Sequence, residues 1–559
     1  MKVFIKSFGC PKNLVDSETI AGILSKNGYI LCGEPEKADI IIINTCAFIA
    51  RARKEAYTSI NQISKNKSQY QKLIICGCLS QYEKSELLEK YPKIDAILGS
   101  SDFYKIMDVL KRLYDNPVLV SLRGETARPG ERRGLAIGGW QSHEIASSVA
   151  QGDLLAMTDE IVPKTRFLPH GFPSGTSNPD KNREPRGCPT MDKKSTVSEH
   201  GAGSHKIVLS SENGFPPKTC GNDKAKKLGL SDNLPRNDIA KQPIKNTTKP
   251  VAEISTPKFI ISNEPKLFST PKSYAYIKIA DGCNNRCSYC IIPDLRGNFR
   301  SRRIEHILSD VQNAVQSGRK EVILVAQDTT MYGIDIYKKF ALNELLQKIS
   351  KIDGLKWIRL LYTHPAHFTD ELISEISENE KVCKYVDIPI QHTDDLILKK
   401  MGRPPVKIVF STIEKLRKKI PDIALRTTVM VGFPGETDKS FTKLLNDIKM
   451  LEFDWLGGFV YSAQKGTAAH KMNNLVPLEV KKERLNEIMA VQQKITFFKN
   501  KKQVGKIFEV LADSEKYGHT EFQTPEIDGK VVFSSEQKTG SITKMKILKV
   551  KKVYDLVSC

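Results

Sequence analysis

Three cysteines, Cys283, Cys287 and Cys290, lie close together in the segment GCNNRCSYC. Cysteine thiolates hold iron–sulfur clusters, and clusters that only carry electrons usually have a protein ligand on every iron. Three thiolates hold three irons of a four-iron cluster and leave the fourth iron open to a small molecule. The C-x3-C-x2-C spacing therefore predicts a 4Fe-4S cluster with an open coordination site.

A structural zinc site is the alternative for such a group of cysteines. Structural zinc sites want four ligands and usually take them from paired C-x2-C units. No nearby fourth cysteine or histidine completes a site of that kind in this sequence. The iron–sulfur cluster is therefore the better interpretation.

A second group of cysteines is spread over the N-terminal part of the chain. Cys10, Cys46 and Cys78 each lie one or two residues past a predicted β-strand, and these strands span 2–8, 38–45 and 72–77. Carboxyl ends of parallel strands face the same crevice, so three separate turns can bring these thiols together. Three unrelated buried cysteines are the alternative. Because Gly9 and Gly77 permit close approach to a bulky group, we favour a second cluster of the same type.

The elements that would position these cysteines fall into three domains. Strands and amphipathic helices alternate over 1–116, which predicts a parallel α/β sheet. Six further strand-like runs separated by helical patterns predict an open (β/α)6 barrel over 269–500. Short strands around turns predict a small all-β domain over 503–559. The triad that begins at Cys283 follows the first barrel strand, where reactive groups of parallel barrels gather.

The stretch 124–262 differs from the rest of the chain in composition. Gly, Pro, Ser, Asn and Lys are abundant, and apolar periodicity is absent over most of it. This composition predicts a long disordered insertion between the first two domains. Its cysteines, Cys188 and Cys220, lack the spacing of metal ligands. We therefore expect no catalytic role for the insertion.

The chain is strongly basic, with a net charge of +22 at neutral pH. Such a charge often accompanies binding to nucleic acid or a ribonucleoprotein; a lysine-rich surface that only serves solubility is the alternative. No apolar run reaches roughly 18 residues, so no transmembrane helix is expected. The N-terminus is typical of a strand rather than a signal peptide. We therefore expect a cytoplasmic protein whose cysteines serve metal binding rather than disulfides.

Several motifs together resemble the radical S-adenosylmethionine (SAM) methylthiotransferases. These motifs are GCPKNLVDSE at 9–18, IPDLRGNFRSR at 292–302, VGFPGET at 431–437 and PEIDG at 525–529. The resemblance covers about 1–116 and 269–559 and leaves the insertion outside. It implies an N-terminal methylthiotransferase cluster domain, a radical SAM barrel and a C-terminal TRAM domain.

Within this family the sequence is similar to the branch that methylthiolates the β-carbon of an aspartate in ribosomal protein twelve of the small subunit. The tRNA-modifying branch usually has Gln and Met where Pro11 and Lys12 stand, and it is not expected to contain PEIDG. A tRNA adenosine methylthiotransferase is the first alternative, and a non-enzymatic iron–sulfur electron carrier is the second. Tyr82 departs from the family, which often has Arg there, and Gln464 and Lys465 replace a common acidic pair.

The resemblance implies two 4Fe-4S clusters and two molecules of SAM. One SAM methylates sulfur held at the N-terminal cluster, and the other binds the open iron of the barrel cluster. Cleavage of the second SAM gives a radical that removes hydrogen from the substrate carbon, because an ordinary base cannot open a C–H bond that lacks acidity. An external electron donor such as flavodoxin or ferredoxin is implied, and we expect a monomer.

Polar side chains at the barrel strand ends are the candidates for binding SAM. Gln327 and Asp328 end the second predicted strand, Gln391 and His392 end the fourth, and Arg426 lies on the fifth. A purely structural role is the alternative for each of these residues. In the last domain, the lysine-rich segment 544–552 suits RNA or an acidic protein surface, or else discourages edge pairing. The resemblance favours recognition of the ribosomal protein.

Overall fold

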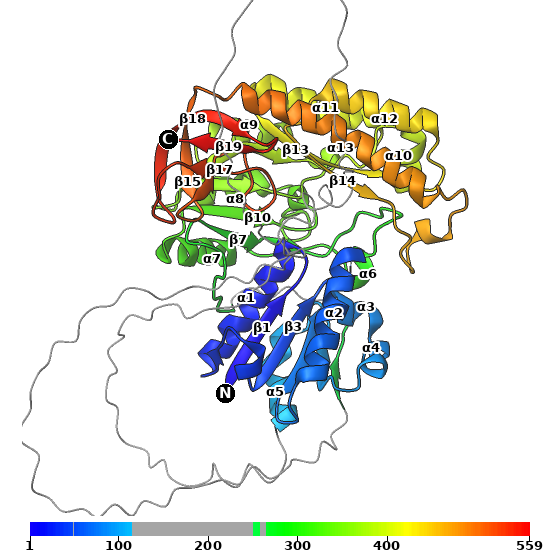
Figure 1. The fold of residues 1–559 in the computed structure, drawn as a ribbon, viewed down its shortest axis with the longest axis vertical. Helices are drawn as coiled ribbons and strands as arrows, with labels where there is room; N and C mark the ends of the chain where they lie inside the picture. The colour runs from blue at the N-terminus through cyan, green and yellow to red at the C-terminus, as the bar shows by residue number, and fades with distance from the viewer. Residues whose placement is uncertain (48–49, 115–249, 258–263) are drawn as a thin grey trace, which may run out of the picture.

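The computed structural model describes residues 1–47, 50–114, 250–257 and 264–559. The predicted insertion, 124–262, therefore lies mostly outside the described residues. The described parts form an N-terminal α/β domain, a larger α/β domain and a small β-barrel at the C-terminus (Figure 1). This arrangement confirms the predicted fold class.

The N-terminal domain is built on a parallel sheet in the order β2-β1-β3-β4-β5-β6. Its strands are β1 (Lys2–Ser7), β2 (Ile30–Leu31), β3 (Ile40–Thr45), β4 (Lys72–Gly77), β5 (Ala96–Leu98) and β6 (Val251–Glu253). Its helices are α1 (Pro11–Lys26), α2 (Ala50–Asn66), α3 (Cys78–Glu83), α4 (Ser85–Lys90) and α5 (Ile106–Tyr114). β3 and β4 are buried along their whole length, as continuous apolar runs in a sheet covered on both faces should be.

Strand β6 lies inside 124–262, the range predicted to be a disordered insertion, so the insertion ends earlier than predicted. Val251 pairs with Ala96 of β5, and Glu253 forms ion pairs with Lys105 and Arg112. Chain beyond the insertion therefore completes the N-terminal sheet. A three-residue edge strand beside polar residues gives too short a pattern to be predicted from sequence.

The second domain contains an open parallel sheet in the order β14-β13-β12-β11-β10-β7. Its strands are β7 (Tyr274–Lys278), β10 (Glu321–Val325), β11 (Trp357–Leu360), β12 (Val382–Asp387), β13 (Ala424–Val431) and β14 (Trp455–Val460). The short pair β8 (Ala280–Asp281) and β9 (Arg300–Ser301) is antiparallel. The two edge strands, β7 and β14, do not pair, so the (β/α)6 barrel stays open as predicted.

Helices cover one face of this sheet and form the main hydrophobic core with it. They are α7 (Ile304–Gln316), α8 (Leu342–Ser350), α9 (Asp370–Glu378), α11 (Val406–Lys419), α12 (Asp438–Leu451) and α13 (Leu478–Lys501). Helix α6 (Ile292–Arg296) packs in a cluster of the N-terminal domain, and α10 (Asp395–Met401) packs in a separate small cluster. None of the helices in the described part of the chain is both long and apolar enough to cross a membrane.

The C-terminal domain is a closed barrel in the order β15-β16-β17-β19-β18. Its strands are β15 (Ile507–Ala512), β16 (Tyr517–His519), β17 (Val531–Phe533), β18 (Ile542–Lys551) and β19 (Asp555–Ser558). The loop between β16 and β17 packs on the sheet face that the helices leave uncovered. There Phe522 joins a cluster with Trp357 and Trp455, and its carbonyl accepts a hydrogen bond from Trp455 Nε1 at 2.9 Å.

Candidate active site

The loop after β8 carries the triad Cys283, Cys287 and Cys290. It is held by two backbone hydrogen bonds, from Cys283 N to the Gly297 carbonyl at 3.1 Å and from Cys290 N to the Cys287 carbonyl at 3.0 Å. Burial, together with the charges of neighbouring cysteines of the triad, raises the pKa of Cys283 to about 11 and that of Cys290 to about 12. The three thiols are thus close enough to interact. Because thiolates are the ligands, a metal must displace protons when it binds here.

Helix α10 lies close to this cysteine loop. The amide of Ser288 donates to the Met401 carbonyl at 2.9 Å, and Ser288 Oγ donates to the Lys400 carbonyl at 2.7 Å. Gly402 ends the helix with a φ of +69°, and a Cβ there would lie 2.8 Å from the Arg286 carbonyl oxygen. The glycine therefore allows the contact that fixes the middle of the loop.

The three N-terminal cysteines lie at the carboxyl ends of neighbouring strands, as predicted. Cys10 precedes α1, Cys46 follows β3 and Cys78 begins α3. Gly9 has a φ of +91°, and a Cβ there would lie 2.5 Å from the Cys46 Cβ, so the first two turns touch. Burial raises the pKa of Cys78, and Cys10 adds to this increase, so these two thiols also interact.

Asn13 joins the turns that carry the N-terminal cysteines. Its Nδ2 donates to the carbonyls of Phe8 at 3.0 Å and Thr45 at 2.9 Å, which precede Cys10 and Cys46. Its Oδ1 accepts from Arg296, a residue of the second domain, at 2.5 Å. No disulfide bond links cysteines within either triad. The donor set of each triad therefore fits a cluster held by three thiolates.

A buried network of charges joins the two domains between the triads. Arg296 is 1% exposed and pairs with Asp281 at 3.1 Å and with Asp16 of α1 at 3.0 Å. Lys278 forms ion pairs with the same two carboxylates. Burial alone would raise the pKa of Asp281, but Arg296 and Lys278 hold it well below its usual range. Each charge in this network thus has a partner of opposite sign.

Of the predicted SAM-binding residues, Gln327 and Asp328 lie beside the loop of the Cys283 triad. Gln327 Nε2 donates to Asp281 Oδ1 at 2.9 Å, while its Oε1 is buried without a hydrogen-bond partner among the described residues. Asn285, which lies between Cys283 and Cys287, donates to Asp328 Oδ2 at 2.8 Å. Gln327 therefore offers a vacant acceptor, and Asp328 holds the cysteine loop.

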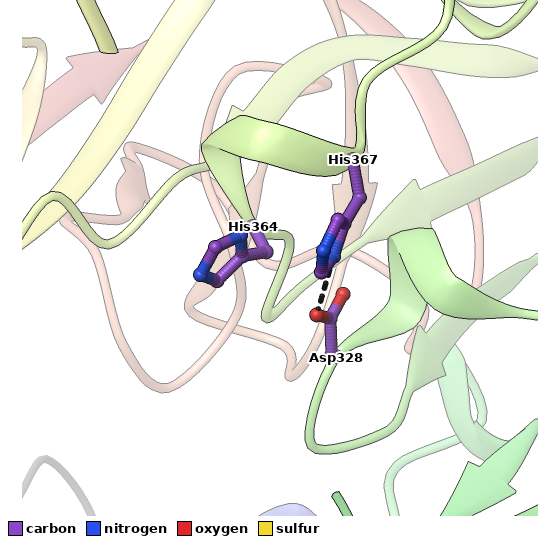
Figure 2. Close-up of side chains that lie close together, drawn as sticks. All are labelled: Asp328, His364 and His367. Atoms are coloured by element: carbon purple, nitrogen blue, oxygen red, sulfur yellow. Dashed lines mark hydrogen bonds and ion pairs between the residues drawn. The ribbon is translucent and has the colours of Figure 1, made fainter. Parts of the chain in front are cut away.

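Asp328 also lies beside two histidines that follow β11. Figure 2 shows the His367 ring directed at Asp328, with His367 Nδ1 2.8 Å from Asp328 Oδ2, and the His364 ring alongside. The ligand atoms of the three residues lie within 4.8 Å of one another, close enough for a metal ion.

However, Asp328 Oδ1 already accepts from Thr330 at 2.6 Å, and Oδ2 accepts from Asn285. Burial and the charge of Arg403 lower the pKa of His364 to about 3. The group is best explained as hydrogen-bonded support for the cysteine loop.

Gln391 and His392 lie past the end of β12. Gln391 has a φ of +68°, and its backbone bonds to β13 through Thr428 and Met430. His392 is fully buried, and its Nε2 lies 3.5 Å from Glu436 of the VGFPGET segment without a hydrogen bond. Their role in SAM binding stays a prediction.

Arg426 lies near the beginning of β13 rather than at its carboxyl end. Its Nη1 pairs with Asp387 at 3.0 Å and its Nε pairs with Asp528 of the C-terminal barrel at 3.3 Å. These ion pairs give Arg426 a structural task, because they tie the sheet to the barrel domain.

Several residues that shape the site were not singled out from the sequence. Lys12, Asn13 and Asp16 all lie in the motif GCPKNLVDSE, and Arg296 lies in IPDLRGNFRSR. The sequence did contain a signal for these residues, because charged residues follow the candidate ligand Cys10 within the same motif. Only the structure shows that they are buried between two domains and which partners they meet.

Comparisons with known proteins identify the class of protein. Residues 277–448 match the family model of the Radical SAM superfamily, and residues 2–99 match that of the uncharacterized protein family UPF0004. A solved radical SAM methyltransferase, TsrM from Kitasatospora setae, is 11% identical with a TM-score of 0.44, over 82% of this chain and 72% of that chain. The domain match and the cysteine triad define a radical SAM enzyme, which implies a 4Fe-4S cluster and SAM as cofactors.

Curated relatives narrow this class. The ribosomal protein uS12 methylthiotransferase RimO of Acetivibrio thermocellus is 34% identical over 100% of this chain and 97% of its own length. The protein of the same name from Thermoanaerobacter sp. (strain X514) is 35% identical over 96% of this chain and 94% of its own length. The chain belongs to the RimO family of radical SAM methylthiotransferases.

Proposed function

We propose that this chain transfers a methylthio group to the β-carbon of an aspartate in ribosomal protein uS12, with one 4Fe-4S cluster on each cysteine triad. The curated relatives are named for action on uS12. The observation that carries the proposal is the placement of two three-thiol groups on the two sides of one domain interface. Lys12 interacts electrostatically with Cys10 of one triad and with Cys290 of the other. Reductive cleavage of SAM uses one such group, which leaves the second for the sulfur.

The two triads have separate tasks in this proposal. When bound, the cluster on Cys283, Cys287 and Cys290 supplies the electron that cleaves SAM, and the cluster on the N-terminal triad presents the sulfur. The chain's own contribution is to hold three thiolates in each place and leave one coordination site open. The Asn285–Asp328 hydrogen bond fixes the radical triad, and Asn13 fixes the N-terminal one.

Four predicted residues are proposed to line the SAM site: Gln327, Asp328, Gln391 and His392. The buried Oε1 of Gln327 supports this most, because an acceptor without a partner costs free energy that a donor on the cofactor would recover. The ammonium group of SAM is such a donor. Arg426 is not carried forward, because carboxylates hold it on two sides.

Helix α1 packs against the barrel domain beside the N-terminal triad. Its residues Leu14 and Val15 are buried in one cluster with Tyr276 of β7 and Leu361 beyond β11. A dry interior strengthens electrostatic interactions and protects a reactive radical from side reactions. We further propose a monomeric, cytoplasmic enzyme that takes electrons from a donor such as flavodoxin or ferredoxin.

Variants of the two triads test the proposal. The anaerobically reconstituted enzyme should methylthiolate a uS12 peptide in the presence of SAM and a strong reductant. Cys283→Ala should abolish both SAM cleavage and modification. Cys78→Ala should lose about half of the bound iron, keep reductive SAM cleavage and lose methylthiolation.

Cys383→Ala is the matched control, because Cys383 is buried on β12 outside both triads. Full iron content in Cys78→Ala would contradict the second cluster. Modification of tRNA but not of the peptide by the unaltered enzyme would instead support a tRNA methylthiotransferase.

A further inference from the structure

The Lys12 side chain is a buried cation with no carboxylate partner. It is 8% exposed, and it forms no ion pair with a carboxylate of the described residues. Its Nζ donates to the Ala326 carbonyl at 3.3 Å and lies 3.5 Å from the centre of the Tyr362 ring. Buried lysines are rare unless they are paired, because loss of water around the ammonium is costly. No carboxylate of the described residues therefore pairs directly with this ammonium.

The position of the ammonium indicates which kind of carboxylate it can meet. Lys12 belongs to the N-terminal domain, but its Nζ crosses the interface to the carboxyl ends of β10 and β11, next to Ala326 and Tyr362. Substrates of parallel barrels meet reactive groups at these strand ends. An ammonium has three donors, and of these the Ala326 carbonyl takes one and the Tyr362 ring faces another. The third N–H group of the ammonium can therefore still donate to one more acceptor.

The charges around Lys12 agree with this interpretation. Asp281 and Asp387 are the carboxylates that act on Lys12 electrostatically. Both carboxylates are already engaged, Asp281 with Arg296 and Asp387 with Arg426. An incoming carboxylate would therefore be the first direct ionic partner of Lys12.

We propose that the Lys12 ammonium binds the side-chain carboxylate of the substrate aspartate and so selects an acidic residue; this rests on the proposed function. A charge-assisted hydrogen bond to the carboxylate holds the neighbouring β-carbon beside the ammonium, which interacts with a cysteine of each triad. An asparagine at the same position offers a neutral amide and gains less from the ammonium. Lys12 is therefore a residue that determines specificity.

Two variants with the full chain and both clusters test this role. Lys12→Met keeps the apolar stem and removes the charge, while Lys12→Arg keeps the charge. Lys26→Met is the matched control, because Lys26 lies on the same helix and is exposed. The measurements are kcat and KM with uS12 peptides that carry Asp or Asn at the modified position, together with substrate-free SAM cleavage and iron content.

We expect Lys12→Met to lower kcat/KM for the Asp peptide by about 10- to 100-fold, the size of a lost hydrogen bond to a charged group. Its preference for Asp over Asn should shrink by a similar factor, while iron content and substrate-free SAM cleavage stay at the level of Lys26→Met. Lys12→Arg should keep the preference for Asp.

Three results would overturn the proposal. An unchanged Asp preference in Lys12→Met would show that the ammonium does not meet the carboxylate. Loss of iron or of substrate-free SAM cleavage would make Lys12 a counter-ion of a cluster. Failure of the unaltered enzyme to modify the Asp peptide would instead refute the proposed function, and the Lys12 proposal with it.

Discussion

Buried ion pairs lie between the two cysteine triads, and Arg296 is at the centre of them. Its guanidinium contacts Asp281 in its own domain and Asp16 and Asn13 in the other. Removing one partner from a buried ion pair is far more costly than replacing the whole pair by apolar groups, because the remaining charge stays buried without compensation. The domain interface therefore depends on this side chain more than on any surface ion pair.

The variant Arg296→Met should lower the free energy of unfolding by about 3–5 kcal/mol, because Asp16 and Asp281 lose their buried guanidinium. Urea unfolding followed by circular dichroism measures this change. Arg303→Met serves as the control, since Arg303 is exposed and should change stability by less than about 0.5 kcal/mol. Equal effects of the two substitutions would show that the network does not stabilise the fold.

At the level of secondary-structure elements, long and strongly patterned segments were predictable and short edge elements were not. The buried runs of β3 and β4 and the six barrel strands appear where their apolar patterns indicate. The position of cysteines at strand ends followed from the same pattern. Strand β6 escaped prediction because its order comes from pairing with β5 and from ion pairs of Glu253, which are tertiary contacts. The ion pair of Arg426 escaped prediction for a related reason, since its partner Asp528 is distant in sequence.

The contact between the C-terminal barrel and the large sheet contains a buried histidine that should respond to pH. His519 of β16 lies between Glu321 of β10 and Asp513, which directly follows β15. Burial acts to lower its pKa, but the two carboxylates raise it to about 9. Stability gained from the charged histidine is complete below its ordinary pKa of about 6.5 and is lost as the pH rises through about 9.

We therefore expect the barrel contact to weaken by about 3 kcal/mol between pH 6.5 and 9.5. Glu526 causes a separate loss at lower pH, because burial raises its pKa from 4.5 to about 7, and stability therefore falls as the pH rises between these two values. Fluorescence of Trp357 and Trp455, which both lie at this contact, reports the change during urea unfolding. His519→Gln should be less stable at pH 7 and show little further loss up to pH 9; a loss as steep as that of the unaltered protein would contradict the assignment.

At the level of the whole molecule, two deletions test whether the chain between α5 and β6 is needed for activity. Removal of 126–245 leaves β6 and Ser255, whose Oγ donates to Asp102 at 2.6 Å. We expect this shortened enzyme to keep its clusters and its methylthiotransferase activity. Removal of 126–260 also removes β6 and should cost roughly 2–4 kcal/mol through lost sheet hydrogen bonds. Loss of activity in a folded, cluster-loaded 126–245 deletion would show that the insertion takes part in the reaction.

The central claim concerns the substrate of the whole enzyme, and one mass measurement tests it most directly. Small-subunit ribosomal proteins and tRNA from cells with and without this gene are digested and compared by mass spectrometry. The proposal predicts a methylthio mass on one aspartate of uS12 that disappears with the gene and returns with the unaltered gene but not with Cys78→Ala. A uS12 that is identical in both strains, with a methylthio group lost from tRNA adenosine instead, would contradict it.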